Sequence, residues 1–487
     1  CEPRGVVAVV SPWNFPLAVP IGGVAAALVG GNRVVLKPSP HTVRTALAGA
    51  TALWDAGVPP SALSVVHAGT ATAAALTAAD GVDAVVFTGS TNTAAAIVAS
   101  RRGRTVFAET GGKNAIVVTD AADRDLAVRD VLTSAFSHSG QKCSAASLVV
   151  CEAPVFDDPA FRRRLVDAVA SLRTGPATDA AVDVAPQVID PNPALAALYS
   201  RLTPGEWWAL EPRRLGPRHR TPGVVWDVQP GSAAHVAELF GPVVGVMRAA
   251  DLDEAIALVN ASGYGLTSGL QSLDEDEWGH WLAGVEAGNL YVNRPTTGAI
   301  VGRQPFGGWR LSGFGPGAKA GGRHYASQLV TVRAAPGHET GTRPAWQRPF
   351  TEMLIENAGI PGQANLTRWL PAPGVVVRFE EADNPAVLEH RLRAAAAVGC
   401  GVDVSRGAHE PVEVLCARLG NVSRLVMCGP AVPPALADAA ARSWTSVCTD
   451  APTGTELDQL AFVREQTVSA DLHRYGWLPP DARIPLP

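Results

Sequence analysis

Three side chains that could do chemistry stand in turns that follow apolar, strand-like runs. They are Cys143 in the segment SGQKCSA, Glu109 in ETGGKN and Asn14 in SPWNFP. Glycine and proline in such turns hold a side chain out of the core, where it can face a ligand. A thiol placed this way is a candidate nucleophile, a carboxylate a candidate general base, and a carboxamide a candidate donor to an oxyanion.

Each of the three also has a plainer explanation. A free cysteine is often a small buried apolar residue, and an asparagine between two prolines often closes an Asx-turn. Glu109 could be a surface or helix-capping residue. The plainer explanation is kept for Cys151, which directly follows the apolar run 147–150.

The surrounding pattern predicts an α/β protein with a parallel, doubly wound sheet. Short β-branched runs at 6–10, 33–36, 63–66, 84–87, 104–107 and 115–118 alternate with helical candidates at about 17–29, 42–56, 70–79 and 91–100. Apolar strands joined by helix-length crossovers are typical of parallel sheets, which bind ligands at the carboxyl ends of their strands. The turns that hold Asn14, Lys37, Gly89 and Glu109 all follow strands, so we expect them at that edge.

The C-terminal third repeats this alternation after a Gly/Pro/Thr-rich linker at 336–344. Strands are expected at 375–379, 424–427 and 446–448, with helices near 385–397 and 434–443. No glycine-rich phosphate loop accompanies them. We therefore expect a catalytically silent α/β lid or assembly domain.

Composition excludes several classes of protein. The 487 residues are 47% hydrophobic and carry a formal net charge of −5 without a basic block, which argues against a nucleic-acid partner. Seven scattered cysteines without CxxC spacing argue against a disulfide scaffold and a zinc site, and suit a reducing cytoplasm. The uncharged stretch 5–32 is interrupted by three prolines, so no membrane span is expected.

The three turns, taken together, closely resemble those of the aldehyde dehydrogenase superfamily. Further motifs follow in that family's order, over a match from about Gly5 to Val332: VLKPS (35–39), FTGST (87–91), ELFGP (238–242) and RQPFGG (303–308). The segments TGAIVGRQPF (297–306) and GAKAGG (317–322) resemble L-glutamate γ-semialdehyde dehydrogenases, also called pyrroline-5-carboxylate dehydrogenases. Such enzymes occur alone or as the second half of proline utilisation A, whose C-terminal domain the segments 464–469 and 473–476 also resemble.

The resemblance implies a domain plan. We expect an NAD-binding domain at 1–110, a catalytic domain at 111–322, a bridging or oligomerisation strand at 323–335, the linker at 336–344 and the C-terminal α/β domain at 345–487. The family has further residues before the PWN turn, including part of the cofactor domain and a dimerisation hairpin. We therefore expect the NAD-binding domain to be N-terminally incomplete, in a fragment of a longer polypeptide or a truncated gene product.

The resemblance also assigns roles to residues. Cys143 would form a thioester, Glu109 would activate the hydrolytic water and Asn14 would stabilise the oxyanion. The cofactor would contact Trp13, Lys37, Gly89, Ser90, Glu238 and Phe240. The substrate would contact Lys142, Ser144, Gly298, Ala299 and Phe306. Several of these residues also have a plainer structural explanation. A lysine at a strand end is usually solvated, the sequence TGS often begins a helix, and Phe306 could simply fill the core.

The implied function is NAD-dependent oxidation of L-glutamate γ-semialdehyde to L-glutamate, by a cytoplasmic homo-oligomer in proline metabolism. Fusion to, or partnership with, a proline dehydrogenase is a further implication. Pro40 stands where many family members carry a glutamate that repels the 2′-phosphate of NADP, so NADP use is expected beside NAD. Two alternatives stay open: a dehydrogenase for another aldehyde, and a non-catalytic assembly module with the same fold.

Overall fold

The chain folds into two compact units. The computed structural model describes residues 1–101, 103–332, 348–477, 484 and 486. Unit 1 comprises Cys1–Thr110, Gly313–Ile355 and Thr367–Gln466, and unit 2 comprises Gly111–Ser312, Glu356–Leu366 and Thr467–Pro487. The chain passes between the units within the strands β21 (Gln363–Pro371) and β26 (Val463–Asp471).

Two further findings concern the chain as a whole. The predicted linker at 336–344, and residues 333–335 of the predicted bridging strand, lie outside the described residues. Among the helices that are described, none has the length and apolar character needed to cross a lipid bilayer.

The first sheet of unit 1 is the predicted parallel, doubly wound sheet, and the prediction of an α/β fold is confirmed. Its strands stand in the order β18-β6-β5-β2-β3-β4, and all pairs are parallel except β18 with β6. The bounds are β2 (Val6–Val10), β3 (Arg33–Lys37), β4 (Leu63–Val65), β5 (Ala84–Thr88), β6 (Val106–Glu109) and β18 (Gly313–Phe314). The apolar sequence VVAVV of β2 is buried because helices cover both faces of the sheet.

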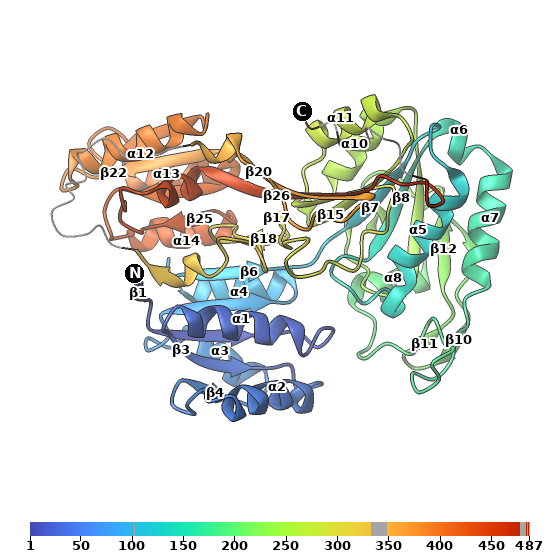
Figure 1. The fold of residues 1–487 in the computed structure, drawn as a ribbon, viewed down its shortest axis with the longest axis horizontal. Helices are drawn as coiled ribbons and strands as arrows, with labels where there is room; N and C mark the ends of the chain where they lie inside the picture. The colour runs from blue at the N-terminus through green and yellow to red at the C-terminus, as the bar shows by residue number, and fades with distance from the viewer. Residues whose placement is uncertain (102, 333–347, 478–483, 485, 487) are drawn as a thin grey trace. The chain divides into compact units, whose positions relative to one another are not determined.

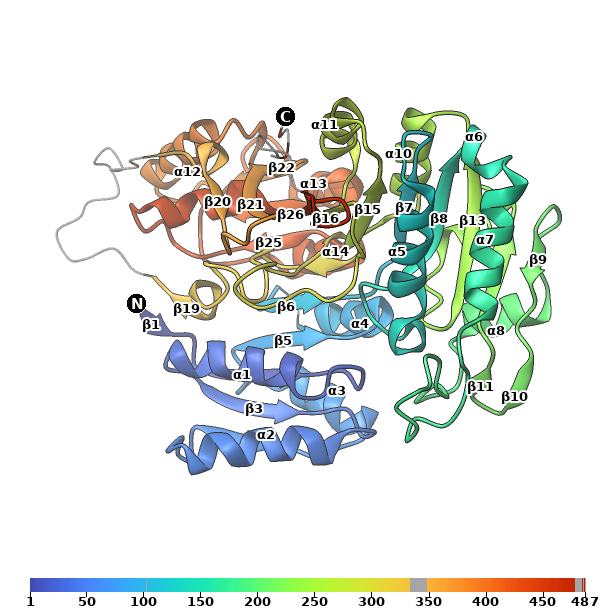
Figure 2. The same ribbon diagram turned by 45° about the vertical axis from the view of Figure 1, so that its right-hand side comes forward.

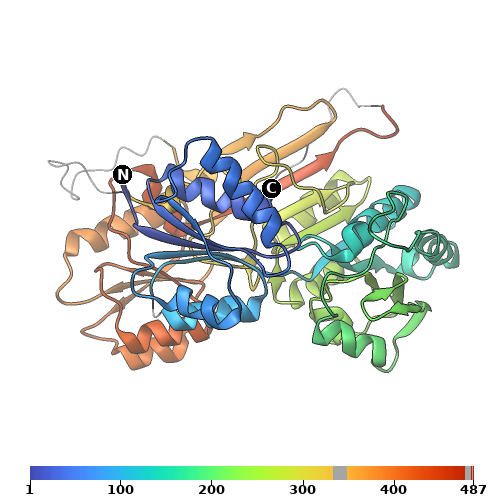
Figure 3. The ribbon, with the colours of Figure 1, turned by 90° about the horizontal axis from the view of Figure 1, so that it is seen from below.

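Two pairs of helices cover this sheet, one pair on each face, as Figure 3 shows for the blue part of the ribbon. Small residues of α1 (Ala18–Val29) and α2 (Val43–Asp55), such as Ala27 and Ala46, pack in one core cluster. Ala94 and Ile97 of α4 (Thr91–Arg101), together with Leu76 of α3 (Thr70–Ala78), pack in a second cluster. Alanine lets these helices approach the β-branched strands closely.

Most strands of this sheet match their predicted bounds to within one residue, but one is shifted by two residues at each end. The expected strand 104–107 is found as β6, Val106–Glu109. Its end is extended because Glu109 pairs with Thr88 of β5 on one side and with Gly313 of β18 on the other. Glu109 is therefore the last residue of a paired strand, and its backbone position is fixed by two neighbours.

The sheet of unit 2 is also mainly parallel. It has the order β16-β15-β7-β8-β13-β12-β9, with β9 antiparallel and with residues Thr467–Ala470 of β26 paired to β16. Its strands are β7 (Asn114–Val118), β8 (Ala146–Glu152), β9 (Trp207–Leu210), β12 (Gly223–Trp226), β13 (Val243–Ala249), β15 (Thr267–Gln271) and β16 (Asn289–Val292).

Helices cover both faces of this second sheet (Figure 2). Residues of α5 (Arg124–Phe136) and α7 (Pro159–Ala170) pack on one face, and residues of α10 (Leu252–Ala261) and α11 (Glu275–Gly284) pack on the other. Asp123 caps α5 and Asp251 caps α10, since their side chains accept hydrogen bonds from main-chain N–H groups of the first turns. The remaining helices of this unit are α6 (Ala153–Phe156), α8 (Pro193–Ser200) and α9 (Ala233–Val236).

The C-terminal part of unit 1 is a four-stranded parallel sheet in the order β23-β22-β24-β25 (Figure 1). The predicted elements are found as β22 (Val375–Phe379), α12 (Pro385–Ala397), β24 (Arg424–Met427), α14 (Pro434–Arg442) and β25 (Ser446–Cys448), and β23 (Val402–Arg406) and α13 (Val412–Arg418) are additional. Trp444 attaches this part to the first sheet: its indole N–H donates to the Gly313 carbonyl at 3.0 Å, and its ring lies 5.1 Å from that of Phe314.

Short elements complete the fold. The short strands are β1 (Glu2–Pro3), β10 (Arg214–Gly216), β11 (His219–Arg220), β14 (Tyr264–Gly265), β17 (Trp309–Arg310), β19 (Val330–Thr331) and β20 (Leu354–Glu356). The 3₁₀ turns are Ser137–Gly140, Ser327–Leu329, Phe350–Glu352, Leu419–Asn421 and Glu456–Phe462.

Candidate active site

The carboxyl edge of the first sheet in unit 1 collects the residues that were predicted to lie there. Residues Trp13 and Asn14 follow β2, Lys37 ends β3, Gly89 and Ser90 follow β5, and Glu109 ends β6. Main-chain hydrogen bonds join these strand ends, from Ser11 N–H to the Lys37 carbonyl at 3.2 Å and from Gly89 N–H to the Glu109 carbonyl at 3.1 Å. Parallel order alone places the four turns side by side, so residues distant in sequence share one edge.

Glu109 has the electrostatics of a group that exchanges protons near neutral pH. Its side chain is partly exposed as a whole, but Oε1 is shielded from solvent and has no hydrogen-bond partner among the described residues. Burial raises the pKa of Glu109 to about 7, while Lys319 and a hydrogen bond from the Ala320 main chain act against that rise. The carboxyl therefore changes charge in the range where a general base is most useful.

Lys319 was not predicted to take part in the site. It is fully buried in unit 1, where burial lowers its pKa against the opposing influence of Glu465 and Glu109. Its main-chain N–H lies 3.5 Å from the Glu465 Oε2 that accepts the bond, and burial raises the pKa of Glu465. Lys319 thus interacts electrostatically with two carboxyl groups. Lys319 stands in the motif GAKAGG, but no role was predicted for it.

In unit 2, a sharply kinked segment leads to Cys143. The residues His138 and Ser139 have φ values of 58° and 56°, and Gly140 follows with φ 68°. A Cβ atom on Gly140 would lie 2.3 Å from the Gly241 carbonyl oxygen, so glycine is required where the two main chains meet. This contact brings the loop that carries Glu238 and Phe240 against the segment before Cys143.

Two side chains hold the main chain around Cys143. The Asn114 amide donates from Nδ2 to the Cys143 carbonyl at 2.6 Å and to the Ala145 carbonyl at 2.9 Å. Thr296 Oγ1 donates to the Ser144 carbonyl at 3.0 Å. These bonds fix the backbone around Cys143, whose side chain is partly exposed. Asn114 stood in the motif ETGGKN without an assigned role, and nothing in the sequence marked Thr296.

Charged groups flank these loops. Burial lowers the pKa of Lys142, whereas a negative Cys143 beside it would raise that pKa. The Glu238 Oε1 accepts a hydrogen bond from Gly112 N–H at 3.1 Å, and burial raises the pKa of Glu238 to about 7. Burial lowers the pKa of neighbouring Lys113 to about 7. Glu238 therefore packs on the glycine turn, where a Cβ atom on Gly111 would lie 2.2 Å from its carboxylate.

The predicted substrate residues take three positions within unit 2. Lys142 and Ser144 flank Cys143 directly, and Ser144 is buried. Gly298 and Ala299 lie in an exposed loop after β16, where Gly298 has φ 89°. Phe306 is partly buried in the same connection. The assignment of these residues to a substrate stays a prediction.

The Gly140 contact provides a test of how the Cys143 segment is held. We expect Gly140→Ala to destabilise the protein by more than about 1 kcal/mol, because the new Cβ meets a carbonyl and the backbone is left-handed. Gly279→Ala is the matched control. Gly279 lies in α11, and a Cβ atom there would have no neighbouring atom within 4 Å. Alanine at this position should therefore raise the free energy of unfolding by about 0.4–1 kcal/mol. Urea unfolding of both variants measures this, and equal midpoints would refute the contact.

Comparison with known proteins places this geometry in context. The model of the aldehyde dehydrogenase family matches residues 1–334. The bifunctional protein PutA of Rhizobium meliloti is 37% identical over 403 residues, which are 78% of this chain and 31% of that protein. A 1-pyrroline-5-carboxylate dehydrogenase of Geobacillus thermodenitrificans is 36% identical over 341 residues, 66% of this chain and 64% of that one.

The solved structure of proline utilization A from Corynebacterium freiburgense is similar over nearly the whole chain. It has a TM-score of 0.88 and 36% identity, over 98% of this chain and 51% of that one. The similarity therefore extends through the C-terminal α/β part, which the family model does not match. The chain spans about a third to a half of the length of these PutA relatives.

Proposed function

Because the chain belongs to the aldehyde dehydrogenase family, we propose that it oxidises L-glutamate γ-semialdehyde to L-glutamate with NAD in proline catabolism. The observation that carries the proposal is the Cys143 segment: a partly exposed thiol on a main chain fixed by Asn114 and Thr296. The similarity to bifunctional PutA and to a 1-pyrroline-5-carboxylate dehydrogenase supports the choice of substrate. The loop 297–306, which resembles this subfamily, supports it further.

In this proposal Cys143 and Asn14 carry the first chemical step. The Cys143 thiolate forms a bond to the aldehyde carbon, and the carbonyl electron pair moves to the oxygen. The Asn14 amide and the Cys143 main-chain N–H donate to that oxyanion, and removing such a donor typically slows a reaction by roughly 10²–10³. Loss of hydride from the adduct then leaves a thioester on Cys143.

Glu109 carries the second step. The Glu109 carboxylate takes a proton from water, whose oxygen attacks the thioester carbon, and the Cys143 thiolate leaves with the electron pair of the broken C–S bond. L-Glutamate is released. The raised pKa of Glu109 supports this role, because a base of pKa about 7 is ionised in a large share of molecules at neutral pH.

The residues at the carboxyl edge of unit 1 fit a dinucleotide. The first turn of α4 at Ser90 presents the positive end of a helix dipole, which suits a diphosphate, and Lys37 suits ribose hydroxyls. Burial lowers the pKa of Lys37, in keeping with a lysine whose stem packs inside the protein. A nicotinamide bound there would supply the hydride acceptor. Trp13, Glu238 and Phe240 are proposed as its further contacts.

We propose in addition a cytoplasmic homo-oligomer, fused to or partnered with a proline dehydrogenase. The similarity to bifunctional PutA proteins supports the fusion. The C-terminal α/β part is proposed to serve as a lid or assembly domain rather than as a second catalytic site.

Substrate identity is tested by comparing kcat/KM for glutamate γ-semialdehyde with values for aldehydes that lack its amino or carboxylate group, following NADH at 340 nm. We expect a clear preference for the complete amino acid head group. Equal values across the series would point to the alternative, a dehydrogenase for another aldehyde. Absence of turnover with every aldehyde, in protein that still binds NAD, would point to an assembly module.

Cofactor selectivity gives a separate prediction. Pro40 is exposed just after Lys37, so a glutamate fits there without displacing the core. We expect Pro40→Glu to raise the ratio of kcat/KM for NAD over NADP by about five- to tenfold, because two solvated like charges repel by about 1 kcal/mol. His41→Glu, at the next exposed position, is the control for added charge. Unchanged ratios in Pro40→Glu would contradict the assignment of this edge to the adenosine ribose.

A further inference from the structure

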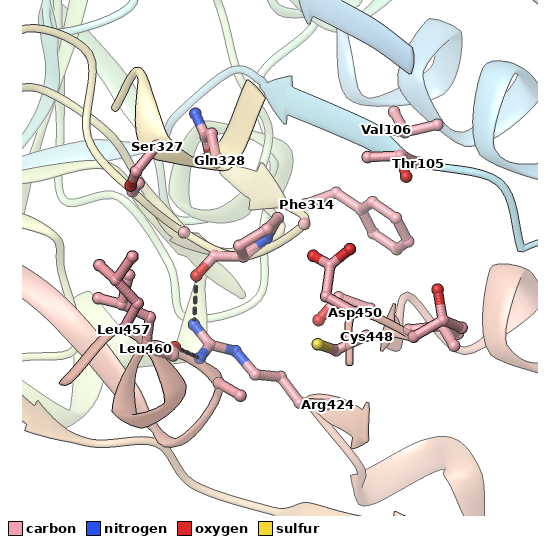
Figure 4. Close-up of a pocket in the computed structure, with 18 of the residues that line it drawn as sticks. Thr105, Val106, Phe314, Ser327, Gln328, Arg424, Cys448, Asp450, Leu457 and Leu460 are labelled. Atoms are coloured by element: carbon pink, nitrogen blue, oxygen red, sulfur yellow. Dashed lines mark hydrogen bonds between the residues drawn. The ribbon is translucent and has the colours of Figure 1, made fainter. Parts of the chain in front are cut away.

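Unit 1 contains a cavity of about 160 Å³ that no step of the proposed reaction uses. Segments of the first sheet, around Val106 and Phe314, form one wall, and α14 with the residues after β25 forms the opposite wall. In Figure 4, Phe314, Asp450 and Cys448 lie around the same pocket. The walls are mainly apolar, with Val98, Val330, Ala440 and Leu460 among the lining residues.

The acidic groups that line this cavity are engaged by the protein. Asp450 accepts from both terminal nitrogens of Arg4, at 3.2 and 2.9 Å. Asp458 accepts from His390, from Thr453 and from Gly454 N–H. Glu465 interacts with Lys319. Each of these three acidic side chains therefore already interacts with a group of the protein.

Arg424, a basic lining group, is engaged in the same way. Its guanidinium donates to the carbonyl groups of Leu460 and Val463 at 2.8 Å and to the Pro316 carbonyl at 2.9 Å, and Figure 4 shows the first and last of these bonds. Arg424 therefore ties the segment at 316 to the C-terminal part. It is a structural element of the cavity rather than a free charge.

Three buried side-chain nitrogen atoms around the cavity have no hydrogen-bond partner in the described structure, although Arg391 also donates from Nη2 to the Asp450 carbonyl. They are Nε2 of His324, Nε1 of Trp369 and Nε of Arg391. The exposed fractions of these residues are 7%, 2% and 3%. The His324 and Trp369 rings lie edge to face with centroids 6.0 Å apart, so two of the donors are neighbours. Buried donors are normally satisfied, and their concentration at one apolar cavity indicates an acceptor that enters from outside.

We propose that this cavity binds a small organic monocarboxylate whose apolar body is about the size of a benzene ring. An apolar cavity of about 150 Å³ holds benzene, so the volume fits such a body. The carboxylate would accept from Arg391 and from the ring N–H groups of His324 and Trp369. An ammonium group is disfavoured because the cationic side chains of Arg391 and Arg424 line the same cavity.

Binding at this place has a structural consequence. The lining residues come both from the family-matched part of unit 1 and from its C-terminal part, so an occupant would contact both. A ligand that binds only the folded protein raises its stability by mass action. The occupant would therefore strengthen attachment of the C-terminal part, independently of the chemistry at Cys143.

The test uses three probes that share a fluorophenyl ring and differ in charge: 4-fluorobenzoate, 4-fluorobenzamide and 4-fluorobenzylamine, each titrated with the full chain by ¹⁹F NMR. We expect the benzoate to bind most tightly, the amide more weakly and the amine not at all. His324→Phe keeps an aromatic ring at this position but removes Nε2. Arg391→Met keeps an unbranched side chain but removes the positive charge. Either variant should weaken benzoate binding by about tenfold or more, since hydrogen bonds to charged groups are the stronger ones.

A second measurement locates the probe. Cys448 lines the cavity and Cys143 does not, so mass spectrometry of iodoacetamide-treated protein distinguishes the two places. We expect the ¹⁹F signal of 4-fluorobenzoate to shift far more on addition of wild-type protein than on addition of Arg391→Met. We also expect the probe to slow alkylation of Cys448 but not of Cys143. Equal affinity for all three probes, unchanged binding in both variants, or protection of Cys143 alone would overturn the proposal. Absence of binding at millimolar benzoate would also overturn it and would mean that water satisfies the donors.

Discussion

Replacing Cys143 with alanine is expected to abolish aldehyde oxidation while leaving NAD affinity nearly unchanged. The thiol forms the covalent adduct, and no other group in the Cys143 segment is a comparable nucleophile at neutral pH. Turnover measured as NADH release should fall below a few per cent of wild type, while a fluorescence titration gives the same NAD dissociation constant.

Cys416→Ala provides the control for loss of a thiol. Cys416 is partly exposed in α13 of the C-terminal part, and its thiol donates to the Ala435 carbonyl at 3.5 Å. It has no role in the proposed reaction, so this variant should keep full activity. Iodoacetamide should inactivate wild type and Cys416→Ala at the same rate. If Cys143→Ala retained substantial turnover, the thioester mechanism would be wrong for this protein.

Replacing Glu109 with glutamine is expected to stop the reaction after hydride transfer. Glutamine keeps the size of the side chain but takes no proton from water, so the thioester accumulates. Stopped-flow traces should show a burst of NADH equal to the enzyme concentration, followed by almost no steady-state rate. Mass spectrometry of the quenched enzyme should show the acyl group on Cys143. Loss of the burst itself would place Glu109 before hydride transfer or in a purely structural role.

The pH dependence follows from the raised pKa of Glu109. The carboxyl is protonated below pH about 7 and is a base above it, so the rate of thioester hydrolysis should rise as pH increases through about 7. An ordinary glutamate would give that inflection near pH 4.3. In Glu109→Gln the inflection near 7 should disappear from the hydrolysis step. An inflection that persists would have to arise from another group.

Sequence patterns predicted much of the fold because its signals are local. The run VVAVV and the alanine-rich segment 18–29 alternate as strand and helix whatever lies around them, and both are found as β2 and α1. The turns after these strands then collect at one edge by the geometry of parallel sheets. The sequence could therefore place Asn14, Lys37 and Glu109 on the same edge without coordinates.

The contacts that hold the site depend on long-range packing, which local patterns do not encode. Asn114 bonds to the main chain at Cys143, and Gly140 meets Gly241, across long stretches of intervening chain.

What the sequence determined by itself was the type and order of most elements and the residues able to do chemistry, since periodicity and turn composition are properties of neighbouring residues. What only the tertiary structure decided was the environment of those residues: the pairing of Glu109 with Gly313, and the burial of Lys319 beside Glu109 and Glu465. Burial and charge proximity set the pKa of Glu109, and both arise only when distant segments pack together.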